Sequence, residues 1–418
     1  MGRRQFSAIG LVALAILVVT VAAVLPRPTG EPAASVDASP AAVASPSATP
    51  TPTLRPEPKH EVYGYVPYWE MDSGIAAHLA KTDLTTLALF SVTHTSKGAI
   101  NTKQNGYRRI TGDVGARMIR QAHERGVRVE LVYTSFGLKR NAALFESIEL
   151  QDKAIASLVA LASDLGLDGI NADVESLDPT LVDAYGNFIG RLRTAVVAAD
   201  PDDRVSVATT ANVTGAAMAS AAVRAGADRI FAMAYDYHWA GSAPGATSPL
   251  DRRDGNEKDL PWSLDLYESM GVPRERMILG LPLYGMSWPV AGPDIGAPQT
   301  GRGDAWIPRQ HLSVLRDASI VPLRDEIEVV EFYALTAEGA TPPPSPPNDP
   351  SVEPSDAPSA DVDWTAIYVD SPETLATKLA LANERGLLGA GFWAIGYERG
   401  LPGYTDLIAR FAAGEPME

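Results

Sequence analysis

The stretch DGINADVE at residues 168–175 has the alternation of a short β-strand and carries several polar side chains. Because side chains alternate along a strand, Asn171, Asp173 and Glu175 point to one face and Asp168 points to the other. Burial of an unpaired polar group costs roughly 2–7 kcal/mol when it is neutral and more when it is charged. These side chains therefore indicate a functional site. A strand end that reaches solvent or caps a helix before Pro179 is the alternative.

Strand-like runs alternate with helical patterns on both sides of this stretch. Strands that are apolar on both faces and are separated by helices predict a parallel sheet, and eight such units predict an α/β fold, the closed (β/α)8 TIM barrel. An open doubly wound sheet is the alternative, but residues 64–69 after the first strand offer aromatics instead of a Gly-rich phosphate loop. The predicted strands are 62–66, 86–92, 127–133, 169–174, 205–209, 230–234, 277–283 and 390–394, with helices at 114–126, 154–166, 181–199, 216–226 and 374–386.

The last two predicted strands are separated by residues 284–389, which is far more chain than a crossover helix needs. We therefore expect a small α+β insertion between strands 7 and 8, at about 298–370, with further strands at 327–333 and 366–369. Residues 341–360 are rich in proline, and we expect them to form a disordered surface loop.

The first part of the chain has the composition of an export signal. Arg3 and Arg4 precede an uncharged run over 9–25, which predicts that residues 1–25 form a signal peptide or a membrane anchor. Residues 26–59 are mainly Pro, Ala, Ser and Thr, and this composition predicts a disordered linker. The barrel is then expected over 60–415. We expect it to be extracellular or in the cell envelope, either secreted or held at the membrane by its N-terminal helix.

Composition excludes several classes of function. The 418 residues include 51 acidic and 35 basic side chains, for a net charge of −16, which argues against a nucleic-acid partner. The absence of cysteine excludes disulfides, thiolate metal sites and cysteine nucleophiles. No histidines are paired at metal-ligand spacing, and His238 is expected at the surface. We expect no metal and no cofactor, and the sequence predicts no protein partner.

Four further motifs accompany the 168–175 stretch in chain order: YGY at 63–65, MAYD at 233–236, LGLPLYG at 279–285 and GFW at 391–393. Together they resemble glycoside hydrolase family 18, whose fourth strand reads D-G-x-D-x-D-x-E. The resemblance covers about 61–407 and departs from the family pattern at Asn171 and at SFGL in 135–138, where the family has S-x-G-G. These departures and the insertion resemble the spore-cortex and cell-wall peptidoglycan hydrolase branch more than the secreted chitinases.

The resemblance implies a catalytic set of Glu175, Asp173 and Tyr235. Glu175 would act as general acid and then as general base. The 2-acetamido group of the substrate would serve as nucleophile, so that no second carboxylate attacks. Asp173 would orient the acetamido N–H and stabilise the oxazolinium-type intermediate, and the Tyr235 hydroxyl would hydrogen-bond the acetamido oxygen. Two displacements give retention of configuration.

Further residues are expected around the sugar. Asp236, Trp393, Tyr65 and Tyr284 are expected to bind substrate, with Trp288 as another candidate wall, although aromatics at barrel mouths also serve as packing. Asn171 is placed with the substrate-binding residues, as a support for Asp173 that would tolerate replacement by aspartate. Asp168 and Gly169 are expected to be structural.

These residues and the resemblance predict an exported glycosidase that cleaves β-1,4 linkages of N-acetylglucosamine-containing polysaccharides, of peptidoglycan or chitin type. One alternative is a catalytically inactive, chitinase-like carbohydrate-binding protein of the cell envelope. Another is an envelope scaffold whose cleft the insertion blocks. The presence of Glu175 favours the enzyme, because lectin-like members of the family typically replace this acid.

Overall fold

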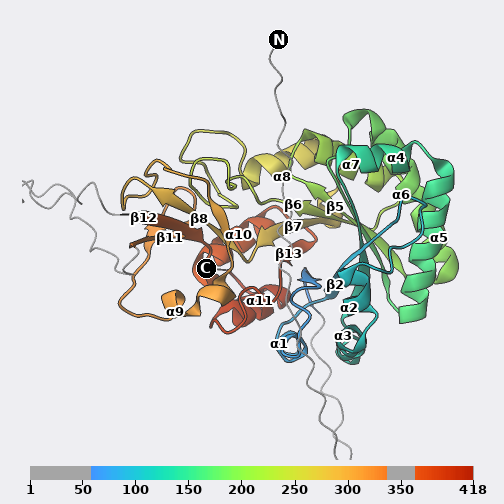
Figure 1. The fold of residues 1–418 in the computed structure, drawn as a ribbon, viewed down its shortest axis with the longest axis horizontal. Helices are drawn as coiled ribbons and strands as arrows, with labels where there is room; N and C mark the ends of the chain where they lie inside the picture. Colours follow the sequence, from blue (N-terminus) through green and yellow to red (C-terminus); the bar gives the residue numbers. More distant parts are fainter. Residues whose placement is uncertain (1–57, 337–362, 418) are drawn as a thin grey trace, which may run out of the picture. The chain divides into compact units, whose positions relative to one another are not determined.

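The computed structural model describes residues 58–336 and 363–417, and eight parallel strands close into a barrel there (Figure 1). Each predicted strand is found within a few residues of its expected bounds, so the predicted (β/α)8 fold is confirmed. Neighbouring strands follow chain order, and the last strand closes the ring against the first. The barrel strands are β1 (Glu61–Pro67), β2 (Thr86–Thr93), β3 (Arg128–Phe136), β4 (Gly169–Glu175), β5 (Arg204–Thr210), β6 (Arg229–Met233), β7 (Met277–Pro282) and β13 (Gly389–Trp393).

The strands are buried on both faces, which explains their near-continuous apolar pattern. Inward-facing side chains fill the barrel interior with a cluster that includes Tyr63, Tyr65 and Phe231. Outward-facing side chains form the larger core under the helices, with residues such as Leu131, Ile170 and Val207 fully buried. The interior is therefore a packed core, so a ligand pocket is expected beyond the strand ends.

Helices cover the outside of the barrel (Figure 1). The helix over Ile148–Leu165 shows how sequence sets these bounds: the Ser147 side chain accepts a hydrogen bond from the Leu150 N–H at its start, and Gly166 ends it with a φ of +63°. The helices are α1 (Ile75–Leu79), α2 (Asn105–Ile110), α3 (Asp113–Glu124), α4 (Leu138–Phe145), α5 (Ile148–Leu165), α6 (Val182–Ala199), α7 (Val213–Arg224), α8 (Leu260–Ser269), α9 (Leu312–Leu315), α10 (Pro372–Glu384) and α11 (Tyr404–Ala412).

A second sheet occupies the chain between β7 and β13. Its strands are antiparallel and run in the order β10-β11-β12-β8-β9. The sheet begins at Gly285, before the expected start at residue 298, because the chain enters its first strand only two residues after β7 ends. The expected loop over 341–360 lies outside the described residues. The strands are β8 (Gly285–Val290), β9 (Asp304–Trp306), β10 (Leu323–Asp325), β11 (Val330–Thr336) and β12 (Trp364–Val369).

The predicted signal or anchor at 1–25 and nearly all of the predicted linker at 26–59 also lie outside the described residues. Within the described ranges, no helix combines the length and the apolarity that crossing a bilayer requires.

Candidate active site

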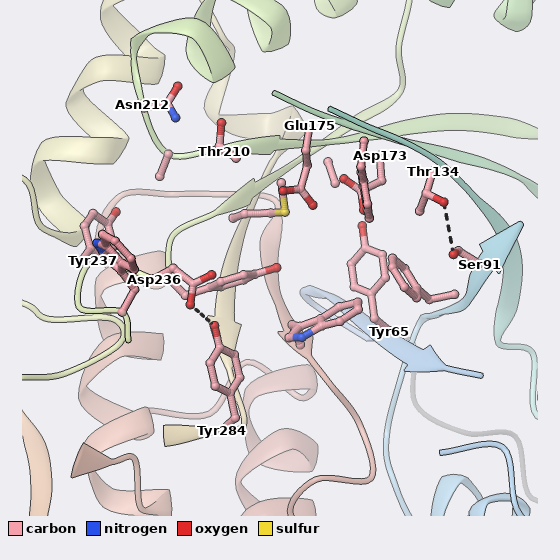
Figure 2. A pocket seen from close by; sticks show the side chains of 18 of the residues that line it. Tyr65, Ser91, Thr134, Asp173, Glu175, Thr210, Asn212, Asp236, Tyr237 and Tyr284 are labelled. Carbon is pink, nitrogen blue, oxygen red and sulfur yellow. Dashed lines mark hydrogen bonds between the residues drawn. The ribbon is translucent and has the colours of Figure 1, made fainter. Parts of the chain in front are cut away.

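A pocket of about 990 Å³ opens at the carboxyl ends of the barrel strands. This is the end at which barrel enzymes carry their chemistry. Side chains from several strand ends reach it, and Figure 2 shows Asp173 and Glu175 extending into it from β4. The pocket brings together most of the predicted site residues: Tyr65, Asp173, Glu175, Tyr235, Asp236, Tyr284 and Trp393.

Glu175 is the last residue of β4, and its backbone is held from the neighbouring strand and helix. The Asn141 side chain on α4 donates to the Glu175 carbonyl at 2.6 Å and itself accepts from the Ser135 hydroxyl at 2.7 Å. The Gly137 N–H donates to the same carbonyl at 3.1 Å. The chain then turns at Ser176, whose φ is +58°. The SFGL sequence therefore fixes the backbone that carries the proposed acid.

The two carboxyl groups at the pocket floor lie in a setting that favours their neutral forms. Burial raises the pKa of Asp173 well above its usual range, and the charge of Glu175 raises it further. Burial also raises the pKa of Glu175, and the second cause is the charge of Asp236. A glutamic acid with a raised pKa can hold a proton near neutral pH and can deliver it to a leaving group.

Asp236 and Tyr284 form a pair on one wall of the pocket. The Tyr284 hydroxyl donates to the Asp236 carboxylate, as Figure 2 shows. Asp236 follows β6 with a φ of +64°, a left-handed conformation that aspartate adopts more readily than most residues. Tyr235 precedes it, and burial is the main cause that raises the pKa of Tyr235 well above its usual range. Its hydroxyl therefore remains protonated and available as a hydrogen-bond donor.

Trp393 ends β13 and is half-buried at the pocket. Its ring meets Phe90 edge to face, with centroids 4.7 Å apart, and lies 5.7 Å from the ring of Tyr65. The exposed ring of Trp69 also lies edge to face against Trp393, with the two ring centroids 6.2 Å apart. These rings give the pocket an apolar side against which the face of a sugar ring can pack.

Three residues predicted near the site do not line the pocket. Asn171 is fully buried beneath it. Asp168 and Gly169 lie at the opposite end of β4, where the Asp168 carboxylate accepts from the Val129 N–H at 2.6 Å. A side chain at Gly169 would meet the Arg204 carbonyl at 2.3 Å, so close strand contact requires glycine there. These positions support the structural roles expected for Asp168 and Gly169, and they place Asn171 below any direct contact with substrate.

Two further expectations were wrong. Trp288 is fully buried in β8, away from the pocket, because β8 belongs to the second sheet. His238 is also buried, and its Nε2 lies 3.3 Å from the Glu328 carboxylate. Glu328 comes from the insertion, so the neighbour that buries His238 is remote in sequence.

Sequence reasoning missed several residues that line the pocket. Phe136 and Trp239 are exposed at its edge and extend its aromatic surface beyond the predicted residues. Arg140 and Lys258 also line it, and neither forms an ion pair within the part of the chain that the structure describes. Phe136 belongs to the SFGL motif, and its position just past the end of a predicted strand could have indicated that it lines the pocket. The loop residues Lys258 and Trp239 carried none.

The burial of Asn171 reverses the expectation that aspartate is tolerated there. The Asn171 amide donates to Ser206 Oγ at 2.7 Å, and the Ser206 hydroxyl donates to Glu130. Asn171→Asp would lose that donor and add a carboxylate to an interior that already holds Glu130 and Asp173. We therefore expect a destabilisation of about 1–3 kcal/mol and a rate loss of more than about tenfold. Urea unfolding and hydrolysis rates measure the two effects. Asn105→Asp, on the exposed face of α2, is the control and should change stability by less than about 0.5 kcal/mol. Equal stability of the two variants would contradict the argument.

A closed α/β barrel with a buried carboxylate pair and a tyrosine at its strand ends has the architecture of a barrel glycosidase. The chain belongs to the glycosyl hydrolases family 18, whose sequence profile matches residues 61–398. It is 21% identical to a cortical fragment-lytic enzyme of Bacillus anthracis over 63% of this chain and 54% of that protein. It is 27% identical to mouse chitotriosidase-1 over 40% of this chain and 33% of that protein. The chain thus matches between a third and just over half of the length of these relatives.

Solved structures show the same fold. The spore cortex-lytic enzyme SleL of Bacillus cereus aligns with a TM-score of 0.64 at 18% identity, over 84% of this chain and 74% of that one. A family 18 chitinase of Cycas revoluta, solved in complex with (GlcNAc)3, aligns with a TM-score of 0.66 at 17% identity, over 85% of this chain and 99% of that one. The similarity to both cortex-lytic enzymes and chitinases confirms the predicted relationship.

Proposed function

We propose that the protein is an exported glycosidase that cleaves β-1,4 bonds next to N-acetylglucosamine, by a substrate-assisted mechanism with retention. One observation carries the proposal: Asp173 and Glu175 share a pocket with Tyr235, and Asp173 Oδ1 is buried without a hydrogen-bond partner in the described part of the chain. An unpaired buried carboxylate oxygen is costly. An acetamido N–H from the substrate would supply its missing donor.

The proposed reaction has two displacements. In the first, protonated Glu175 gives its proton to the glycosidic oxygen as the acetamido carbonyl oxygen attacks the anomeric carbon, and the leaving sugar departs as an alcohol. Asp173 accepts the acetamido N–H, and the developing positive charge favours its ionised form, which in turn stabilises the positive ring. The Tyr235 hydroxyl donates to the acetamido group. In the second, the Glu175 carboxylate takes a proton from water, which attacks the anomeric carbon from the vacated side. The acetamido group is restored and configuration is retained.

Two other readings of the barrel are less well supported. A carbohydrate-binding protein without activity would not need Glu175, which is present with a raised pKa at the pocket floor. A scaffold with a blocked cleft is disfavoured because no described residue of the second sheet lines the pocket.

The test is release of reducing ends from three substrates: peptidoglycan, soluble chito-oligosaccharide and high-mannose glycan. We expect hydrolysis of one of the first two, with the β-anomer formed first in an NMR time course. Release of the α-anomer first would exclude retention, and no release from any of the three would contradict the proposed activity. Export is tested separately, by fractionating cells that produce the full chain.

Positive side chains at the pocket favour an anionic glycan among these substrates. Arg140 and Lys258 line the pocket and form no ion pair with any residue in 58–336 or 363–417, in a protein whose net charge is −16. Arg140 is fixed in place, because its guanidinium donates to Thr93 Oγ1 at 2.7 Å and to the His94 carbonyl. Peptidoglycan carries carboxylates on its peptides, or on its lactyl groups where the peptide is absent, whereas chitin is neutral. With the cortical fragment-lytic enzyme among the relatives, this charge favours peptidoglycan as the substrate.

Replacement of Lys258 should lower activity on peptidoglycan but not on neutral chito-oligosaccharide. Lys258 is exposed, with its ammonium 5.9 Å from the Trp262 ring centroid, so its loss should leave the fold intact. We expect Lys258→Ala to lower kcat/KM on peptidoglycan fragments about two- to fivefold, as for loss of an exposed ion pair, and to leave neutral chito-oligosaccharide unchanged. The difference should vanish at high salt. Lys153→Ala, on the exposed side of α5, is the control. An equal loss on both glycans would contradict recognition of charge.

A further inference from the structure

Glu130 is a fully buried carboxylate and the third residue of β3, and the proposed reaction does not use it. Its two oxygens have different partners. Oε1 accepts from Arg229 Nη1 at 3.4 Å, while Oε2 accepts from the Tyr63 hydroxyl at 2.7 Å and from the Ser206 hydroxyl. Burial raises the pKa of Glu130, while the Arg229 cation and the two hydroxyl donors stabilise its ionised form. Because an ionised carboxylate only accepts hydrogen bonds, both hydroxyl protons are directed at Glu130.

Because the Ser206 hydroxyl donates its proton to Glu130, the directions of the hydrogen bonds to Asn171 and Tyr65 are also fixed. Ser206 Oγ can then only accept from Asn171, whose Nδ2 lies 2.7 Å away. The Asn171 amide is thereby oriented with Oδ1 toward Tyr65, and the Tyr65 hydroxyl donates to it at 3.2 Å. The chain of hydrogen bonds has one direction, from Tyr65 through Asn171 and Ser206 to Glu130.

The first member of this chain lies next to the catalytic pair. Burial is the main cause that raises the pKa of Tyr65 well above its usual range, and the charge of Asp173 adds to it. Figure 2 shows the Tyr65 side chain directed toward Asp173. A tyrosine has one proton to donate. As long as Tyr65 gives it to Asn171, Asp173 Oδ1 receives no hydrogen bond from Tyr65.

We propose that Glu130 is a positioning residue for the catalytic pair. Its carboxylate fixes the direction of the hydrogen bonds through Ser206 and Asn171, and this direction keeps the Tyr65 proton away from Asp173. Asp173 Oδ1 is thus kept free for the acetamido N–H of the sugar. The inference rests on the proposed acetamido-assisted reaction for its catalytic consequence, but the direction of the hydrogen bonds is a property of the protein alone.

The charges around the two carboxylates support this assignment. Arg229 reaches Glu130 with one nitrogen and Glu61 with another at 2.7 Å, so a cation compensates the buried charge of Glu130. The titratable and charged side chains that interact with Glu130 are Glu61, Tyr63 and Tyr65 of β1 and Arg229 of β6. The titratable side chains that interact electrostatically with Asp173 are Tyr65, Glu175, Tyr185 and Tyr235.

Glu130→Gln tests the proposal because Arg229 decides how the new amide is placed. The amide oxygen would face Arg229, so the amide nitrogen would face Ser206 and donate to it. Ser206 would then donate to Asn171, the Asn171 amide would turn over, and Tyr65 would be left to donate to Asp173. We expect kcat on chito-oligosaccharide to fall at least about tenfold, with KM changed less than about threefold, because the acetamido contact is tightest in the transition state.

Glu130→Gln in a Tyr65→Phe background shows whether Glu130 positions the catalytic pair or only supports the fold. Without the Tyr65 hydroxyl there is no proton to misdirect, so Glu130→Gln should then change kcat less than about twofold. Tyr63→Phe is the matched control, since it removes the other hydroxyl that donates to Glu130. The Tyr63 oxygen also lies 3.2 Å from Ser206 Oγ, but the hydrogen bonds that run from Tyr65 through Asn171 and Ser206 to Glu130 do not include it. Its kcat should stay within about threefold of wild type. An equal loss from Glu130→Gln with and without Tyr65 would overturn the proposal.

A measurement without substrate decides the direction of the hydrogen bonds independently of activity. The titration of Asp173 can be followed in the full chain by 13C NMR of carboxyl-labelled aspartate, assigned with Asp173→Asn. A hydrogen bond donated by Tyr65 would favour the charged form, so Glu130→Gln should lower the pKa of Asp173, and the shift should be absent in the Tyr65→Phe background. An unchanged titration would refute the role of Glu130. If wild type cleaves no N-acetylglucosamine glycan, the proposed function fails while the NMR result still decides this inference.

Discussion

Glu175→Gln is expected to lower the rate of reducing-end release by about 10²–10⁴-fold, which is the usual contribution of a general acid and base. Glutamine keeps the size of the side chain and its place at the end of β4, but it cannot give a proton to the glycosidic oxygen or take one from water. Both displacements depend on Glu175, so both should slow. The measurement is reducing-end release from the preferred glycan, with wild type and variant compared at equal concentration.

Binding distinguishes this loss from damage to the pocket. The Glu175 backbone is held by Asn141 and Gly137, neither of which contacts the carboxyl group. Glu175→Gln should therefore bind the same oligosaccharide as tightly as wild type in calorimetry. Glu149→Gln, on an exposed residue of α5, should leave the rate unchanged. Wild-type turnover by Glu175→Gln would sink the mechanism and would favour a carbohydrate-binding role for the pocket.

The barrel was predictable because its strands are buried on both faces. A run such as Ile230–Ala234 packs inward on the barrel interior and outward on the helices, so its residues are apolar whatever the details of packing. The start of the second sheet was not predictable in this way. Gly285–Val290 follows β7 after two residues, and nothing in its composition separates it from the barrel strand. Trp288 was therefore a candidate wall of the site, with packing as the alternative, and it packs in the core.

The candidate site was predictable where one strand carries several of its residues. The alternation of side chains along β4 was enough to identify Asn171, Asp173 and Glu175, since polar side chains at that spacing share a face. Contacts between strands were not visible: the partners of Asn171 come from β1 and β5. A signal for Glu130 existed, because a lone glutamate in the apolar run 127–133 should be either paired or functional. Its partner Arg229 lies 99 residues away, so sequence alone could not choose between the two.

Lys378→Met is expected to lower the free energy of unfolding by about 3–5 kcal/mol, the cost of breaking a buried ion pair from one side. The Lys378 ammonium on α10 lies 2.5 Å from the Asp370 carboxylate, and the two side chains are 0% and 4% exposed. Asp370 follows β12 directly, and its carbonyl accepts from the Tyr404 hydroxyl of α11 at 2.6 Å. The pair thus joins the end of the second sheet to the last two helices of the barrel. Urea unfolding measures the loss.

A double variant tests whether the loss of stability comes from the Asp370 carboxylate that Lys378→Met leaves buried without its cation. In Lys378→Met the Asp370 carboxylate keeps only the Thr374 hydroxyl, at 2.8 Å, as a side-chain donor in the described structure. Adding Asp370→Asn removes the charge, so the double variant should regain most of the lost stability, as buried pairs replaced on both sides usually do. Lys153→Met is the matched control, because its pair with Glu149 is exposed and should be worth less than about 1 kcal/mol. If Lys378→Met costs no more than Lys153→Met, the pair does not hold the second sheet to the barrel. If the double variant is as unstable as the single one, lost packing of the lysine stem is the cause instead.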